Sequence, residues 1–186
     1  MPESVWADCR FGKFHAIEVE DEVHATMRYP NELIVQLTAS SGELPGSNVL
    51  ELVGDQGAIR FANGTLEKAA LSQGRNDHSA NTKDMFGMPE SNWETISLSD
   101  QANPHQELWQ EFVDAINGSG VSSVSLAEGV NSIELANALL LSSWNNTSVA
   151  LPLDAEAYGK ALTERESGFR TPLDIEANID MNASYR

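Results

Sequence analysis

Residues 17–40 constrain the fold of this chain more than any other stretch. Polar and apolar residues alternate from 17 to 29, and Asp21 is the one polar residue among the otherwise apolar odd positions. A period of two is typical of a β-strand with one buried and one outer face. Residues 30–32 (PNE) interrupt the pattern, because proline cannot donate to a ladder, and the alternation resumes over 33–39. The stretch predicts a long β-hairpin in the middle of an antiparallel sheet.

Shorter strands are predicted on both sides of this hairpin, separated by turns rich in glycine. They cover residues 5–7, 48–53, 58–61, 65–71 and 93–98. Residues 72–92 are polar and lack a period, so we expect a long loop there.

Helix signals follow the strands. Asn103-Pro104 is a typical helix start and precedes an apolar stripe that ends before Gly118. The members of the stripe are Leu108, Trp109, Phe112, Val113 and Ile116. Ser125 and Glu128 have the spacing of a capping box, and the helix after them is apolar over much of its girth. A short strand (149–153) and a helix capped by Asp154 complete the pattern.

The order of strands first and helices last predicts an α+β fold, an open, largely antiparallel β-sheet with helices packed on one face. We expect one domain over residues 1–165 and a C-terminal arm or tail over 166–186. The helix after Ser125 should contact the apolar side of the central hairpin. The residues expected in that contact are Ile133, Leu140 and Trp144 on the helix, and Val19, Val23 and Met27 on the strand.

The chain is strongly acidic, with 28 acidic and 11 basic residues and a formal net charge of -17. That charge argues against nucleic acid or an anionic membrane as a partner. A single cysteine, Cys9, excludes an internal disulfide, and no apolar run has the length of a membrane span. We therefore expect a cytoplasmic protein.

No motif in the sequence carries chemistry by itself. There is no G-x-G-x-x-G turn, P-loop, H-E-x-x-H pair or nucleophile elbow. We therefore predict no catalytic, cofactor-binding or metal-binding residue in this chain.

Polar residues concentrate around Asp21. A carboxylate on the apolar side of a strand is either a functional acid or a structural one that sits at a bulge or binds a backbone amide or Arg28. His15, just before the strand, is a stronger candidate for the substrate side of a site, because loops at the ends of sheets line clefts. An ordinary surface histidine is the alternative.

Six blocks, in order, resemble the C-terminal domain of the glucose–fructose oxidoreductase/inositol dehydrogenase (Gfo/Idh/MocA) family. They are HAIEVEDEVHATMRYPNE, a Ser-Ser loop followed by LPG, VLELVGDQGAIRF, ELWQEFVDAINGSG, SLAEGVNSIELANALLLSSW and VALPL. The resemblance covers residues 5–162.

The resemblance implies a two-domain enzyme in which an N-terminal Rossmann domain binds NAD or NADP. Hydride then moves between the cofactor and a hydroxyl carbon of a sugar or polyol. This chain lacks the Rossmann fingerprint, the Glu-Lys-Pro motif and the Asp-x-x-x-His helix of the family. No family catalytic residue can therefore be carried over, and the isolated chain is predicted to be inactive.

Two functions remain open. In the first, the chain is the substrate-side and oligomerisation domain of an NAD(P)-dependent dehydrogenase whose Rossmann domain is missing. The start of the chain close to a predicted strand favours this expectation. Alternatively, it is a free-standing module that dimerises or binds a ligand without redox chemistry.

The resemblance also implies a homodimer through the open face of the sheet. Like charges in contact are costly, so we expect the less acidic residues of that face to form the contact centre. They are His24, Thr26, Arg28, Gln36 and Thr38.

Overall fold

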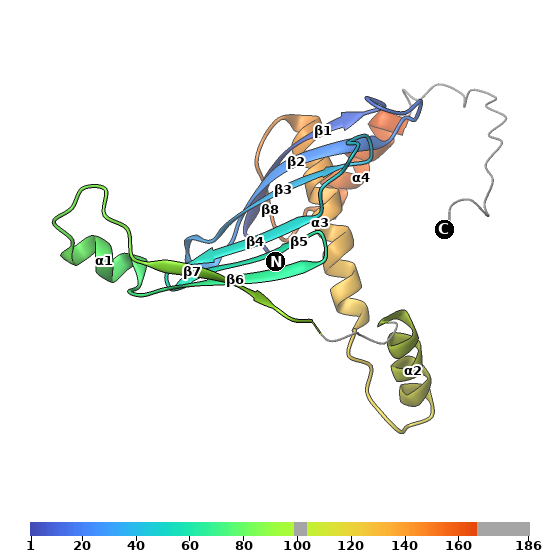
Figure 1. The fold of residues 1–186 in the computed structure, drawn as a ribbon. Helices are drawn as coiled ribbons and strands as arrows, with labels where there is room; N and C mark the ends of the chain where they lie inside the picture. Colours follow the sequence, from blue (N-terminus) through green and yellow to red (C-terminus); the bar gives the residue numbers. More distant parts are fainter. Residues whose placement is uncertain (99–103, 167–186) are drawn as a thin grey trace. The chain divides into compact units, whose positions relative to one another are not determined.

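The computed structural model describes residues 1–98 and 104–166 and divides into two compact units (Figure 1). Unit 1 comprises residues 1–42 and the chain from 125 onward, and unit 2 comprises residues 43–124. The predicted arm over 166–186 lies outside the described residues except for Glu166.

Unit 1 contains a four-stranded antiparallel sheet, sheet A, with the order β3-β2-β1-β8. Its strands are β1 (Ser4–Phe11), β2 (Glu20–Arg28), β3 (Ile34–Ser40) and β8 (Val149–Ala150). The predicted hairpin is β2 and β3, although β2 begins three residues after the alternation does. A 3-10 turn (η1, Pro30–Glu32) joins them, and Asn31 there adopts φ 62°, which asparagine tolerates better than most residues.

Helix α3 (Leu126–Asn145) covers one face of sheet A along β1, and α4 (Ala155–Glu166) contacts α3. The predicted capping box begins α3, with Glu128 N donating to Ser125 Oγ and Ser125 N donating to the Glu128 carboxylate. The core consists mainly of small and aliphatic side chains from sheet A and α3. Its buried members are Val5, Ala7, Cys9, Ala25, Met27, Ala138, Leu139, Leu141 and Val149. The predicted α+β fold is thus confirmed, with the antiparallel strands divided between two sheets and α3 packed on one face of sheet A.

The predicted contact between helix and hairpin is correct for one half of the helix only. Leu140, Trp144 and Val23 pack against the core, and Met27 belongs to it. Ile133 and Val19 remain 63% and 58% exposed, so their prediction as core residues was wrong. Val19 precedes β2, and Ile133 lies in the half of α3 before its first buried residue, Ala138.

Unit 2 contains the second antiparallel sheet, sheet B, with the order β4-β5-β6-β7. Its strands are β4 (Val49–Gly54), β5 (Gly57–Ala62), β6 (Thr65–Leu71) and β7 (Ser91–Ile96). The predicted long loop contains a short helix, α1 (Arg75–Asn81). Asp55 holds its first turn, because the Asp55 carbonyl accepts from Arg75 N and the Asp55 carboxylate accepts from Asn76 N. This contact across about 20 residues leaves no periodic signal.

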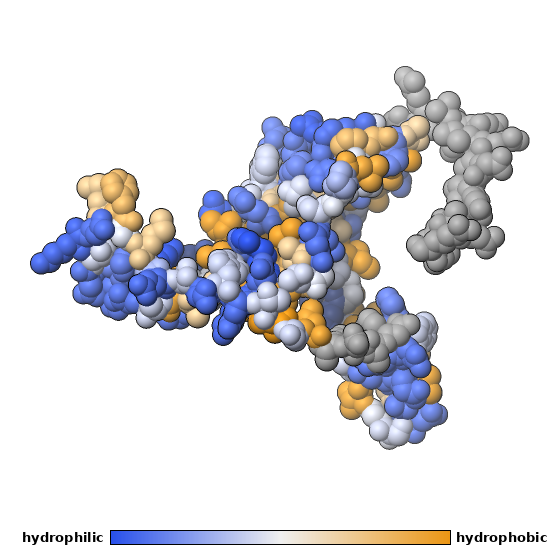
Figure 2. Space-filling view, in the orientation of Figure 1, coloured by the Kyte–Doolittle hydropathy of each residue, from blue (hydrophilic) through white to orange (hydrophobic). Residues whose placement is uncertain are grey.

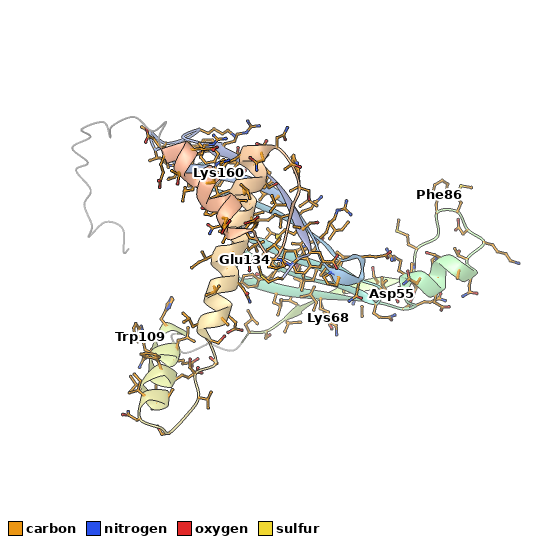
Figure 3. All side chains as sticks on the ribbon, turned by 180° about the vertical axis from the view of Figure 1, so that it is seen from behind. Asp55, Lys68, Phe86, Trp109, Glu134 and Lys160 are labelled. Carbon is orange, nitrogen blue, oxygen red and sulfur yellow. The ribbon has the colours of Figure 1, made fainter. Side chains whose placement is uncertain are left out.

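Helix α2 (Pro104–Ile116) carries the predicted apolar stripe, but the stripe is not buried within the described part of the chain. Trp109 and Ile116 are each 68% exposed. Figure 2 shows hydrophobic side chains at the surface of α2, and Figure 3 shows Trp109 projecting from it. Phe86, on the loop after α1, is also exposed (Figure 3).

Candidate functional site

The loop between β1 and β2 is organised by one buried carboxylate. Asp21 Oδ1 accepts a hydrogen bond from Lys13 N at 3.0 Å, and Asp21 Oδ2 accepts from Phe14 N at 2.6 Å and from His15 N at 3.1 Å. The β1–β2 ladder pairs Arg10 with Glu22 and Phe11 with Glu20, so Asp21 is the extra residue of a bulge. The bulge directs its side chain into the loop.

Two opposing effects act on the pKa of Asp21. Burial raises it, and hydrogen bonds from the backbone amides of Phe14, Lys13 and His15 and from the His15 side chain together outweigh burial and hold the pKa below its ordinary value of 3.8. The structural alternative predicted for Asp21 is therefore correct, both as a bulge and as an acceptor for backbone amides. Its partners are these amides, and Arg28 is not among the partners that the structure gives it.

His15 lies on this loop, at the end of sheet A where the sequence predicted it. Its Nδ1 atom is 3.5 Å from Asp21 Oδ2 and 3.3 Å from Ser41 Oγ, at the end of β3. The side chain is 47% exposed, so the ring contacts both protein and solvent. Ser41 was not predicted as a partner, because it lies 26 residues away along the chain.

A second carboxylate, Glu22, is also buried at the start of β2. Lys13 Nζ donates to Glu22 Oε2 at 2.6 Å, and this hydrogen bond is the main reason that the pKa of Glu22 lies below its ordinary value. Lys13 also lies over the Phe14 ring, 4.6 Å from its centroid. Together these side chains form the β1–β2 loop cluster, which comprises Lys13, Phe14, His15, Asp21, Glu22 and Ser41.

The outer face of sheet A, opposite α3, brings all the predicted dimer-face residues together. Cross-strand partners form rows there: Trp6–Thr26–Gln36, Asp8–His24–Thr38 and Ser4–Arg28–Ile34. In the second row, Thr38 Oγ1 lies 3.4 Å from His24 Nδ1. Trp6 and Ile34 add exposed apolar area that the sequence analysis did not identify, because β1 and the start of β3 were not aligned with β2 from sequence.

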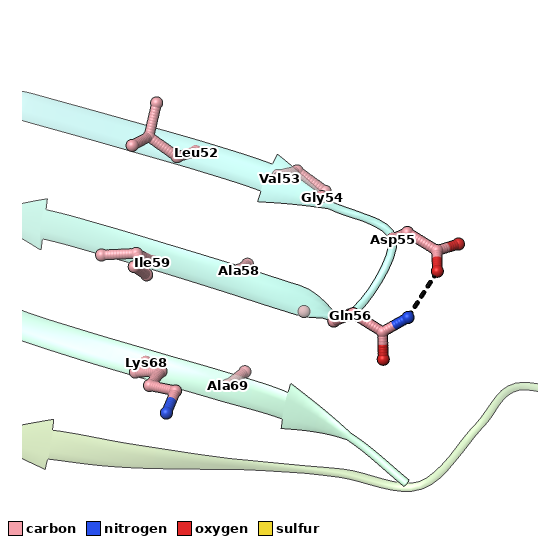
Figure 4. A pocket seen from close by; sticks show the side chains of 10 residues that line it. Leu52, Val53, Gly54, Asp55, Gln56, Ala58, Ile59, Lys68 and Ala69 are labelled. Carbon is pink, nitrogen blue, oxygen red and sulfur yellow. Dashed lines mark hydrogen bonds between the residues drawn. The ribbon is translucent and has the colours of Figure 1, made fainter. Parts of the chain in front are cut away.

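A shallow pocket of about 450 Å³ lies on sheet B at the β4–β5 turn (Figure 4). Leu52, Ile59 and Lys68 form one cross-strand row of its lining. At its rim Gln56 Nε2 donates to Asp55 Oδ2 at 2.6 Å, so those polar groups bind each other (Figure 4). The pocket lacks the convergent polar groups of a ligand site, and the β1–β2 loop cluster is the stronger candidate.

The starts of α3 and α4 do not fit the pyrophosphate of a dinucleotide. Such a group binds free backbone amides at a helix N-terminus after a glycine turn. At α3 the Glu128 carboxylate already accepts from Ser125 N at 2.9 Å. At α4 the Asp154 carboxylate accepts from Glu156 N and Ala157 N. A negative charge therefore already occupies each of these two helix starts.

Residues 1–98 and 104–166 contain neither a metal-binding cluster nor a membrane-spanning helix. No group of three or more His, Cys, Asp or Glu side chains is arranged there to hold a metal ion. Burial raises the pKa of the Cys9 thiol, which favours its neutral form. In the same residues no helix combines the length and apolarity needed to cross a bilayer.

The sequence also matches a known protein family. The profile of the oxidoreductase family Gfo/Idh/MocA, for its C-terminal alpha/beta domain, matches residues 1–151. The chain belongs to this family. The predicted resemblance is thereby confirmed over most of the chain.

Solved structures share the fold of this Gfo/Idh/MocA domain. The WlbA dehydrogenase from Chromobacterium violaceum, in complex with NADH and UDP-GlcNAcA, has a TM-score of 0.56 at 18% identity, and the match covers 82% of this chain and 41% of that one. An NAD-binding protein from Listeria innocua has a TM-score of 0.59 at 16% identity, covering 80% and 41%. Levoglucosan dehydrogenase, in complex with NADH and L-sorbose, has a TM-score of 0.59 at 17% identity, covering 82% and 45%.

The chain thus spans less than half of the length of each of these proteins. A comparison with curated proteins found no match.

Proposed function

We propose that this chain is the substrate-side and oligomerisation domain of an NAD(P)-dependent sugar or polyol dehydrogenase, and that it has no catalytic activity by itself. The observation that carries the proposal is the family match over residues 1–151. The matched enzymes include dehydrogenases solved with NADH and with a sugar or sugar nucleotide. Such a domain contacts the substrate, and a Rossmann domain supplies the cofactor.

The β1–β2 loop cluster supports the substrate-side part of the proposal. It combines a half-exposed imidazole, a lysine and an exposed aromatic ring on a loop fixed by Asp21. Imidazole and ammonium groups form hydrogen bonds with hydroxyl groups. An aromatic ring such as that of Phe14 presents an apolar surface for the C–H groups of a sugar.

The outer face of sheet A supports the oligomerisation part. Two of its acids are neutralised within the chain, because Asp8 pairs with Arg10 at 2.7 Å and Glu22 pairs with Lys13 at 2.6 Å. These pairs reduce the repulsion between two copies of an acidic chain. We therefore propose a homodimer with a two-fold axis through this face, with Thr26 and Thr38 near its centre.

A free-standing module without redox chemistry is the second candidate. The acidic caps of α3 and α4 favour it over a chain that binds the cofactor alone. Such a module dimerises or binds a ligand, so the dimer does not separate the two candidates, and binding of a sugar or polyol together with the absence of cofactor binding is what favours the first.

Titration of the purified chain tests the proposal. Nuclear magnetic resonance should report shifts of loop signals on addition of myo-inositol or glucose, while calorimetry should detect no binding of the four nicotinamide cofactor forms. Micromolar affinity for a nicotinamide cofactor would contradict the assignment as a substrate-side domain. Indifference to both polyols would favour the module without redox chemistry.

A further inference from the structure

We propose that Asp21 and Ser41 are positioning residues that hold the proton of neutral His15 on Nδ1, so that Nε2 accepts a hydrogen bond from a hydroxyl group of a polyol or sugar ligand. The inference deepens the proposed function and rests on it for the ligand. The tautomer itself follows from the contacts of the β1–β2 loop cluster alone.

Asp21 is an acceptor next to His15 Nδ1. An ionised carboxylate only accepts hydrogen bonds, and three backbone amides favour the ionised form of Asp21. Its Oδ2 atom is 3.5 Å from His15 Nδ1. An acceptor on this side of the ring stabilises a proton on Nδ1.

Ser41 is the second neighbour of His15 Nδ1. Its hydroxyl has one hydrogen, and Ser41 Oγ donates to the Asp21 backbone carbonyl at 3.3 Å. The Asp21 carbonyl can only accept, so donation of the hydroxyl hydrogen to it leaves the lone pairs of Oγ to accept from His15 Nδ1 at 3.3 Å. Both neighbours of Nδ1 are acceptors, so the proton of the neutral ring belongs on Nδ1.

The other ring nitrogen of His15, Nε2, is available to a ligand. In neutral imidazole one nitrogen donates and the other accepts, so Nε2 of His15 is an acceptor. Within residues 1–98 and 104–166, no protein group forms a hydrogen bond with Nε2, and the side chain is 47% exposed. A ligand that offers hydroxyl donors satisfies this atom. A ligand with only carbonyl or carboxylate oxygens does not.

The loop holds this geometry before any ligand binds. Asp21 accepts from the amides of three consecutive residues, including His15 itself. Gly12 begins the loop at φ +58°, and a Cβ there would lie 2.5 Å from the Ile17 carbonyl oxygen. A loop fixed in this way loses little conformational entropy on binding.

His24 provides an internal contrast in the same protein. Its Nε2 atom is 3.6 Å from the Glu22 carboxylate, and its Nδ1 atom is 3.4 Å from Thr38 Oγ1, a hydroxyl that can donate. The same reasoning gives neutral His24 a proton on Nε2. The two histidines should therefore be opposite tautomers.

Long-range ¹H–¹⁵N correlation of the imidazole rings, on the full chain at a pH where both rings are neutral, tests the inference. The His15 signals are assigned by their loss in His15→Gln. We expect the Nδ1–H pattern for His15 and the Nε2–H pattern for His24. An Nε2–H pattern for His15 in the unsubstituted protein overturns the inference, and that measurement needs no variant to fold.

Two variants test the positioning role. Asp21→Asn introduces an amide donor near Nδ1, and Ser41→Ala removes the hydroxyl acceptor, so each should lower the Nδ1–H population of His15 and leave His24 unchanged. An unchanged His15 tautomer in folded Ser41→Ala and Asp21→Asn overturns the role of these residues. If Asp21→Asn does not fold, Ser41→Ala decides.

Addition of myo-inositol or glucose tests the ligand. We expect a shift of His15 Nε2 that His15→Gln abolishes together with at least a tenfold loss of affinity. Shifts elsewhere in the chain without a change at Nε2 would overturn the role of His15 alone and leave the proposed function standing. No shift anywhere would overturn the proposed function and, with it, the ligand of His15.

Discussion

Ser142 of α3 completes the backbone hydrogen bonding of β1 at Ala7. The Ser142 hydroxyl accepts from Ala7 N at 3.0 Å and donates to the Thr147 carbonyl at 2.7 Å. The short strand β8 pairs with Ser4 and Val5, and among the residues that the structure describes no strand neighbours β1 on that side beyond them. A helix side chain therefore takes the place of a strand at a fully buried position.

Ser142→Ala removes this partner and leaves a buried amide without a hydrogen bond. We expect the free energy of unfolding to fall by about 1–3 kcal/mol, the usual cost of an unsatisfied buried group. Urea denaturation measures it. Ser143→Ala is the matched control, since it removes the acceptor of Cys9 N at a less buried site, and it should cost less. Equal losses would contradict the argument from burial.

Leu141 contributes to the core between α3 and sheet A and is 6% exposed. Leu141→Ala should lower the free energy of unfolding by about 2–5 kcal/mol, through lost burial and the cavity that remains. Leu126→Ala is the control on the same helix, because Leu126 is 87% exposed, and it should cost less than about 0.5 kcal/mol. Similar unfolding midpoints for the two variants would contradict the observed packing of α3.

Asp21 and Glu22 should make stability depend on pH. The pKa values of both are lowered in the folded protein, so their stabilising effect is present above the ordinary values of 3.8 and 4.5 and is lost as the pH falls below them. Asp21→Asn should lower the urea midpoint at pH 7 and narrow the difference between pH 7 and pH 3. Glu20→Gln, which neutralises an exposed acid of the same strand, is the control for the loss of one charge. If the urea midpoints of Asp21→Asn at pH 7 and pH 3 differed as much as those of the unsubstituted protein, other acids would be the cause of the pH dependence.

Gly57 begins β5 at a backbone angle that other residues rarely adopt, with φ +147°. A Cβ at Gly57 would lie 2.0 Å from the Ala69 backbone oxygen, so Gly57→Ala forces β5 and β6 apart. We expect a loss of more than about 1 kcal/mol, measured by thermal unfolding. Gly64→Ala is the control, because Gly64 also has a positive φ but no atom within 4 Å of its added Cβ. If Gly64→Ala lowered the stability as much as Gly57→Ala, the positive φ alone would explain both losses and the contact with Ala69 would not be needed.

The proposed homodimer is tested by adding charge at its centre. Light scattering at micromolar concentration should give twice the chain mass for the unsubstituted protein. Thr26→Glu with Thr38→Glu should reduce it to one chain mass, because like charges in contact repel. Thr65→Glu with Thr163→Glu adds the same charge outside sheet A's outer face and should leave the dimer intact. A monomeric unsubstituted protein would show that this face of sheet A is solvent-exposed.

Local patterns in the sequence were sufficient for most elements. Alternation predicted β2 and β3, Asn31 marked their turn, and Ser125 with Glu128 marked the start of α3. These signals depend on residues within a few positions of one another, so no knowledge of the tertiary structure is needed to recognise them. The six ordered blocks also identified the family, which the profile match confirmed.

Tertiary structure decided what depends on residues far apart in the chain. The bulge at Asp21 follows from the register of β1 against β2, the contact of His15 with Ser41 spans 26 residues, and the bond between Ala7 and Ser142 spans 135. Alternation cannot reveal register, because shifting a strand by two residues preserves the pattern of its faces. Val19 and Ile133 were misassigned for a related reason, since a pattern indicates which side is apolar but not where the neighbouring element ends.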